Sequence, residues 1–79
     1  MIVISFDTTS YAMKADKFFE STSVRKMVVP TPRAISQSCG ISIRIEKKEL
    51  ETVKKLIQSN DLKIKGIYEV ENNTATKIY

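Results

Sequence analysis

The only cysteine of the chain stands at the end of a polar loop and is the residue best suited to chemistry. The loop runs from Pro30 to Gly40 of this 79-residue sequence. A cysteine attacks as its thiolate, which nearby cations and hydrogen-bond donors favour over the thiol. Arg33 brings a cation, and Ser36 and Ser38 bring hydrogen-bond donors. Pro30, Pro32 and Gly40 would shape the turn around Cys39. This setting predicts a reactive thiol.

A structural role for Cys39 competes with the reactive one, because cysteine is among the residue types most often buried. Cys39 shares strand parity with Ile41, Ile43 and Ile45, so a strand that began early would direct it to the core. Gly40 weakens this parity argument, since a glycine can mark a turn or a bulge. The residues alone leave the two interpretations evenly balanced.

Other reactive sites have little support in the sequence. The chain has no histidine, so a Cys–His pair cannot form within it, and one cysteine cannot build a soft-metal site in one subunit. It has no Cys-x-x-Cys motif and no glycine-rich phosphate loop. The acidic residues fit helix caps or solvated faces better than an acid–base pair. We therefore expect no cofactor and no metal.

The elements that must position the loop follow from the hydrophobic pattern. The pattern predicts strands over Ile2–Phe6, Lys26–Val29, Ile41–Glu46 and Ile64–Val70, with helices over Tyr11–Ser21 and Glu49–Gln58. This order predicts an α+β, ferredoxin-like βαββαβ fold, with a four-stranded antiparallel sheet and both helices on one face. The domain would cover residues 1–70, and residues 71–79 would form a polar tail or a short edge strand. Such a fold would place the cysteine loop beside residues 7–10, where the first helix begins.

Composition indicates a folded soluble protein, with 42% hydrophobic and 28% charged residues. No apolar run approaches the roughly 20 residues that would span a bilayer. The first residues, Met1–Ile4, lack the basic region of a signal peptide. We therefore expect a cytoplasmic protein with no membrane association.

The formal net charge of +4 could attract nucleic acid or an acidic protein. The lysines are spread over both predicted helices and several loops, which favours an ordinary solvated surface. The outer face of the third predicted strand carries Ser42, Arg44 and Glu46. It has none of the aromatic residues that stack on bases in RNA-recognition domains of similar topology, so nucleic-acid binding is the weakest alternative.

The loop resembles that of the selenium/sulfur carrier-like protein family of small bacterial proteins. The shared pattern is Pro-x-Pro-Arg-x-Ile-Ser-x-x-Cys-Gly, matched by Pro30, Pro32, Arg33, Ile35, Ser36, Cys39 and Gly40. Residues 12–17 are similar to the family's helix start, and residues 66–68 also fit. The resemblance covers nearly all of the chain up to about Val70.

This resemblance implies that Cys39 carries sulfur or selenium as a persulfide or selenosulfide, between a donor protein and an acceptor protein. It implies that Arg33 and the Gly40 N–H stabilise the sulfur anion, and that Ser36 and Ser38 hydrogen-bond it or shape the turn. The protein would then be no enzyme in the strict sense. A second thiol nearby would discharge a persulfide as a disulfide, and this chain has none.

Two other functions stay open from the sequence. A small protein-interaction or regulatory module would use the sheet and keep Cys39 as a structural residue. Binding of nucleic acid through the positive charge is the weaker of the two. Strand edges also make a homodimer plausible.

Overall fold

The structure is a computed structural model that describes residues 1–35 and 39–79. The roles predicted for Ser36 and Ser38 therefore lie outside the described residues. The strands are β1 (Ile2–Ser5), β2 (Lys26–Pro30), β3 (Ile41–Ile45), β4 (Gly66–Glu71) and β5 (Thr74–Lys77). The helices are α1 (Thr9–Glu20), the short 3₁₀ turn η1 (Lys47–Glu49) and α2 (Leu50–Asn60).

The sheet has five antiparallel strands in the order β2-β3-β1-β4-β5. The predicted four-stranded ferredoxin-like sheet is therefore wrong. The added strand β5 arises because Asn72 and Asn73 have φ of 47° and 67° and join Glu71 to its partner Thr74. Two successive residues with positive φ form the tight turn that matches the twist of a hairpin, and asparagine tolerates that conformation. Residues after the last predicted strand thus extend the sheet.

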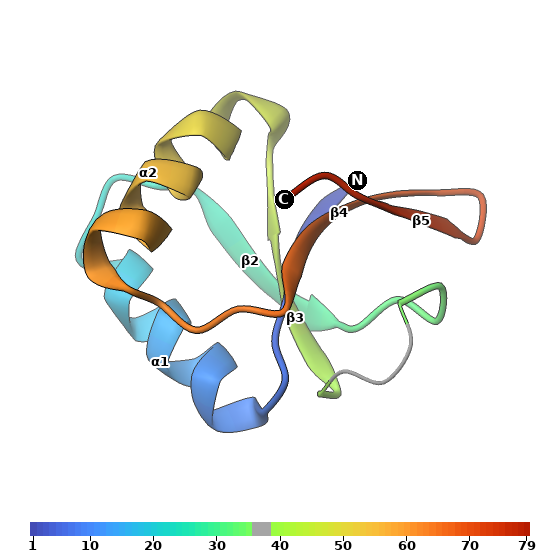
Figure 1. Ribbon diagram of the computed structural model, residues 1–79, viewed down its shortest axis with the longest axis horizontal. Helices are drawn as coiled ribbons and strands as arrows, with labels where there is room; N and C mark the ends of the chain where they lie inside the picture. Colours follow the sequence, from blue (N-terminus) through green and yellow to red (C-terminus); the bar gives the residue numbers. More distant parts are fainter. Residues whose placement is uncertain (36–38) are drawn as a thin grey trace.

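One face of the sheet is covered by α1 and α2, which lie on the same side in Figure 1. Side chains of alternate strand positions meet the apolar stripes of both helices there. This cluster buries Ile2, Ile4, Phe6, Ala12, Ala15, Phe19, Val24, Ile43, Ile45, Val53, Ile57 and Ile67. The helix-covered face is therefore the main hydrophobic core.

The opposite face of the sheet also contains fully buried residues. Val3, Ser5 and Ser42 have no exposed surface, and their alternation with Ile4 and Ile43 directs them away from the helices. Thr31, just after β2, contacts this face through a 2.8 Å hydrogen bond between its hydroxyl and that of Ser42. Ile35, four residues further on, is 6% exposed. Residues 31–35 thus cover the second face, away from the helices in Figure 1.

The ends of α1 are fixed by local side chains. The Thr8 hydroxyl accepts a hydrogen bond from the Tyr11 N–H at 3.1 Å and caps the first turn. At the other end, the hydroxyls of Ser21 and Thr22 donate to the carbonyls of Phe18 and Phe19 at 2.7 Å each. These bonds satisfy carbonyls that a helix end leaves free and direct the chain into β2.

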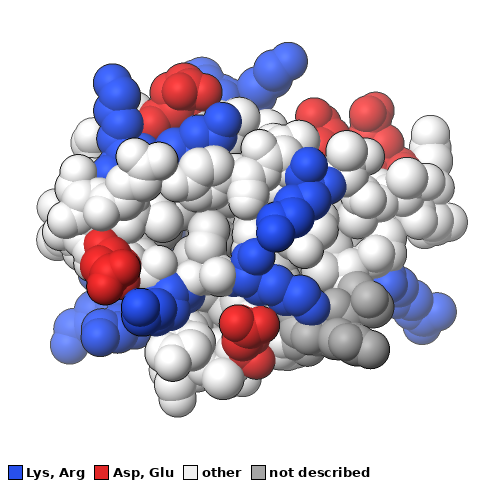
Figure 2. All heavy atoms as spheres, viewed as in Figure 1, with Lys and Arg blue, Asp and Glu red and all other residues white. Residues whose placement is uncertain are grey.

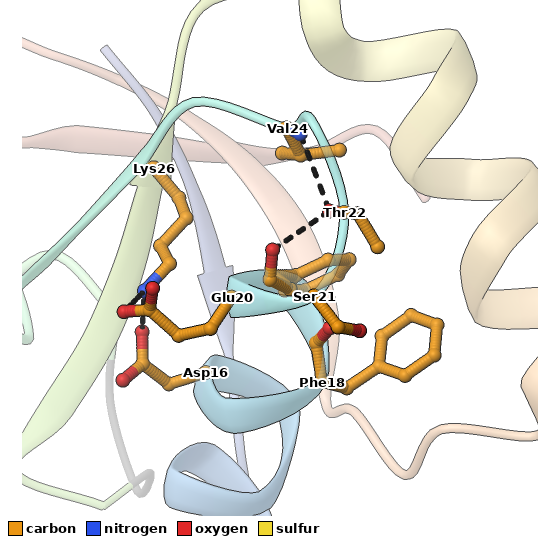
Figure 3. Close-up of polar contacts among 8 residues, drawn as sticks. Asp16, Phe18, Glu20, Ser21, Thr22, Val24 and Lys26 are labelled. Atoms are coloured by element: carbon orange, nitrogen blue, oxygen red, sulfur yellow. Dashed lines mark hydrogen bonds and ion pairs between the residues drawn. The ribbon is translucent and has the colours of Figure 1, made fainter.

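A partly buried cation joins β2 to α1. The Lys26 ammonium contacts the carboxylate of Asp16 and donates to Glu20 at 2.7 Å (Figure 3). The Lys26 side chain is 11% exposed. The hydrogen bonds to Asp16 and then Glu20 raise the pKa of Lys26 above its ordinary value, against a smaller opposing effect of burial. This contact holds the edge strand against the helix.

Candidate functional site

The backbone of Cys39 is held where three segments of the chain meet. Its N–H donates to the carbonyl of Phe6 at 3.1 Å, directly after β1. Its own carbonyl accepts from the Thr31 hydroxyl at 2.7 Å, and the Thr31 N–H donates to Gly40 at 3.0 Å. These bonds close the two ends of the cysteine loop against each other and against the end of the central strand.

The sulfur of Cys39 is partly buried and packs against the helix-side core. Its S–H donates to the carbonyl of Ile41 at 2.9 Å. The sulfur is the donor in this bond, because a carbonyl oxygen can only accept. A transfer reaction therefore requires the side chain to leave this hydrogen bond. The side chain of Cys39 thus packs partly on the core and is partly exposed to solvent.

The residues predicted to assist the sulfur occupy different positions around the loop. Arg33 is exposed, and no ion pair or hydrogen bond joins it to Cys39 within the part of the chain that is described. Pro30 ends β2. The carbonyl of Pro32 accepts from the Ile35 N–H at 3.0 Å and closes a turn. The two prolines thus lie at the start of the loop, where they limit its conformations.

Gly40 is not required by steric crowding. A Cβ atom built on Gly40 meets no atom within 4 Å, and no glycine has a positive φ. Its N–H stays the group predicted to stabilise a sulfur anion. A small side chain at this position would leave that N–H in place.

The sequence predicts that the cysteine loop lies beside residues 7–10, where α1 begins. These residues directly follow Phe6, whose carbonyl accepts a hydrogen bond from the Cys39 N–H. The first turn of α1 is occupied by its own cap, since Tyr11 donates to the Thr8 hydroxyl and Ala12 to the Thr8 carbonyl. The structure brings Cys39 beside the residue that precedes this segment, through the bond to Phe6.

A group of hydroxyls under the loop was missed by sequence reasoning. Thr31 bonds both Ser42 and the Cys39 carbonyl. Ser5 follows Ile4, the residue of β1 that pairs with Ile43. The Ser5 hydroxyl is buried and has no hydrogen-bond partner among the described residues. A serine in an otherwise apolar strand (Ile2-Val3-Ile4-Ser5-Phe6) was the available signal. The loop is thus anchored over polar groups.

Charged side chains are spread over the surface of the protein. Figure 2 shows Lys and Arg side chains spread over the face in view, several of them beside Asp and Glu side chains. Among residues 1–35 and 39–79, no cluster of three or more His, Cys, Asp or Glu side chains could hold a metal ion. No helix in these ranges is long and apolar enough to cross a membrane.

The fold and the site define a small α+β protein with a single, partly buried thiol at the end of a closed loop. Residues 1–69 match the family described as "Putative Se/S carrier protein-like", and the chain belongs to that family. No curated protein and no solved structure gave a significant match. The description of the family points to a carrier of selenium or sulfur.

Proposed function

We propose that the protein carries sulfur or selenium covalently on Cys39, as a persulfide or a selenosulfide, between a donor and an acceptor protein. The observation that supports this most is the partly buried sulfur at the end of a hydrogen-bonded loop, in a chain with no other thiol. Partial burial protects a persulfide from small thiols in solution, while one accessible side admits a partner. The reducing cytoplasm suits this role, because it keeps a single cysteine reduced.

Loading of the carrier is redox-neutral. The Cys39 thiolate attacks the outer sulfur of a donor persulfide, the donor's S–S bond breaks, and a new S–S bond forms on Cys39. The donor's inner sulfur leaves as a thiolate and takes up the proton lost by Cys39. Unloading repeats the exchange, with an acceptor nucleophile attacking the outer sulfur or selenium and Cys39 leaving.

The neighbouring residues have separate roles in this proposal. The thiol first leaves the Ile41 carbonyl, because attack requires the thiolate. Arg33 and the Gly40 N–H stabilise the negative charge on the loaded sulfur. Ser36 and Ser38 keep both of their predicted roles, which are to hydrogen-bond the sulfur or to shape the turn. Pro30 and Pro32 shape the loop.

The test is transfer of radiolabelled sulfur from a cysteine desulfurase, followed by intact mass. The parent should gain one sulfur atom, and Cys39→Ser should gain none. A matched control moves the thiol: Cys39→Ser with Ser59→Cys places a cysteine on an exposed position of α2. Labelling of this relocated thiol at the parent's rate would contradict a dedicated site.

Alkylation of native Cys39 against pH separates the carrier from a structural cysteine. A carrier reacts in the native state, and its reaction rate reaches a plateau as the thiol ionises. Reaction only after denaturation would overturn the proposal in favour of an interaction module whose cysteine is structural.

A further inference from the structure

An apolar groove lies on the helix side of the sheet, between α1 and the strands β2 and β3. Its volume is about 570 Å³, and its lining is Ala12, Met13, Lys14, Asp16, Lys17, Val28, Ile41 and Ile43. Isoleucine and valine side chains of the sheet form the floor. Charged residues come from α1 alone. The groove therefore has an apolar base and one charged wall.

The groove exists because α1 packs on β3 and leaves Val28 of the edge strand β2 exposed. Val28 pairs with Ile43, so its side chain is on the helix face, yet it is 45% exposed. Met13, on the facing side of α1, is 62% exposed. Contiguous exposed apolar side chains mark interaction surfaces, and methionine adapts its shape to a partner.

The acidic and basic residues of the groove wall differ in whether they have ion-pair partners. Asp16 is engaged by Lys26, which also bonds Glu20. Lys14 and Lys17 are exposed and form no ion pair with any residue in ranges 1–35 and 39–79. The free charge at the groove is therefore positive, which is complementary to an acidic partner.

The groove is linked to the cysteine site through Ile41. Ile41 lines the groove, and its carbonyl accepts the hydrogen bond of the Cys39 thiol at 2.9 Å. An occupant that covers Ile41 is thus beside the sulfur and can influence its hydrogen bond.

The free edge of β2 is poorly suited to pairing with another strand. The Thr31 N–H bonds the Gly40 carbonyl, so alternation in an antiparallel ladder points the backbone groups of Val28 and Pro30 outward. Proline has no N–H to offer a new strand. A helix laid in the groove needs no such bonds.

We propose that this groove binds an acidic amphipathic helix of the donor or acceptor protein, and so presents that partner's reactive group to Cys39. The apolar stripe of the helix packs on Met13 and Val28, and its carboxylates pair with Lys14 and Lys17. The choice of partner rests on the proposed carrier function.

The first experiment measures binding of a synthetic helical peptide with a leucine stripe flanked by glutamates. The control peptide has lysines in place of the glutamates. Lys14→Glu/Lys17→Glu should weaken binding of the acidic peptide about tenfold or more, because attraction becomes repulsion. Lys47→Glu/Lys55→Glu changes the net charge equally at exposed positions outside the groove and should change binding less than about twofold.

A second pair of variants tests the apolar base. Met13→Ser should weaken binding about fivefold or more, since it removes exposed apolar contact area. Met27→Ser is the matched control, because Met27 is 60% exposed but its parity places it on the opposite face of the sheet. Equal effects of the two substitutions would overturn the proposal.

Sulfur loading distinguishes a failure of the groove from a failure of the carrier. In the groove variants, a small inorganic polysulfide should still load Cys39. Transfer of sulfur from the partner protein should decrease in proportion to the loss of affinity for the peptide. If Cys39 loads with neither donor and the peptide still binds as described, the carrier function fails and the groove stands. Absence of groove-dependent peptide binding overturns the groove proposal, as does groove-dependent dimerisation in sedimentation.

Discussion

The two faces of the sheet are buried by different means. The helix-covered face is closed by two regular elements whose apolar stripes meet strand side chains in one cluster. The opposite face is closed over Ser5 and Ser42 by an irregular segment that includes Thr31 and Ile35. The sulfur of Cys39 packs toward the first face, while its backbone is anchored by Thr31 on the second.

This difference separates stability from chemistry. Packing of two helices onto a sheet supplies the large, non-directional burial that a small domain needs. Hydroxyls beneath a loop fix backbone positions through directional bonds, which can hold a thiol in one place. We expect substitutions on the helix-covered face to affect folding most, and substitutions under the loop to affect the geometry of Cys39.

The largest contrast should come from the same substitution on each face. Ile4→Ala removes a fully buried side chain from the core and should cost about 4 kcal/mol of unfolding free energy. Ile35→Ala should cost about 2 kcal/mol, because the irregular segment can settle into part of the cavity. Urea denaturation of both variants measures the difference in unfolding free energy. Equal losses would show that the two faces of the sheet respond alike to the removal of a buried side chain.

The two buried serines should respond in opposite directions. Ser5→Ala removes a buried hydroxyl without a partner among the described residues and should stabilise the fold by about 1 kcal/mol. Ser42→Ala removes the partner of Thr31 and should destabilise it by about 1 kcal/mol. Both are measured by denaturant midpoint. Destabilisation by Ser5→Ala would mean that its hydroxyl is bonded in solution.

The Lys26 contact should contribute a pH-dependent amount to stability. Because the folded pKa of Lys26 lies above the ordinary value of 10.5, the folded state binds this proton more tightly. The contribution is complete below pH 10.5 and is lost as the pH rises through the folded pKa. Lys26→Met should lower the unfolding free energy by about 1 kcal/mol at neutral pH, because the partly exposed carboxylates limit the strength of the ion pair. The loss should be smaller at alkaline pH.

The control for the pH effect is Lys55→Met, which replaces an exposed lysine of α2. Its stability difference from the parent should stay constant between neutral and alkaline pH. A parallel loss in both variants would show that the alkaline effect does not come from the ion pair that joins β2 to α1.

The smallest effect is expected at the loop glycine. Gly40→Ala meets open space and needs no left-handed backbone, so it should leave stability unchanged or raise it by about 0.5 kcal/mol. It should also retain sulfur loading, because alanine keeps the N–H. Gly66→Ala is the comparison, since its Cβ would lie 2.8 Å from Lys77 Cε and force side chains to move. Thermal melts of the two variants test the ranking.

The sequence predicted the regular elements well where hydrophobic spacing was strong. The six predicted helices and strands all occur, with ends shifted by one or two residues. The first helix starts at Thr9 rather than Tyr11 because Thr8 is the capping residue. The second helix continues to Asn60, where Asp61 ends it with a left-handed φ of 50°.

The sequence left residues 71–79 open between a polar tail and a short edge strand, because the composition does not mark the fifth strand. Thr74–Lys77 is nearly all polar, and only Ala75 is partly buried, so no alternation of apolar residues marks it. The pair Asn72–Asn73 was the available signal of a hairpin. Edge strands gain most of their stability from backbone pairing with a neighbour, which a hydrophobic pattern does not reveal.

The position of Cys39 in the fold was predictable, whereas the direction of its side chain was not. The spacing of Cys39 from Ile41 and Ile43 indicated a core-directed side chain, and the loop composition indicated a reactive one. The direction of the sulfur depends on the hydrogen bond to the Ile41 carbonyl and on the bonds of Thr31. The groove depends on how far α1 is displaced from β2, which no local pattern encodes.

The central position of β1 has a consequence for the order of folding during synthesis. β1 leaves the ribosome before both of its neighbours in the sheet, β3 and β4, which end at Ile45 and Glu71. Its apolar residues Ile2–Ile4 therefore stay unpaired until those strands have been made, and non-local pairing of this kind is slow. A nascent or truncated chain that stops before Gly66 leaves one edge of this strand open to pair with other chains.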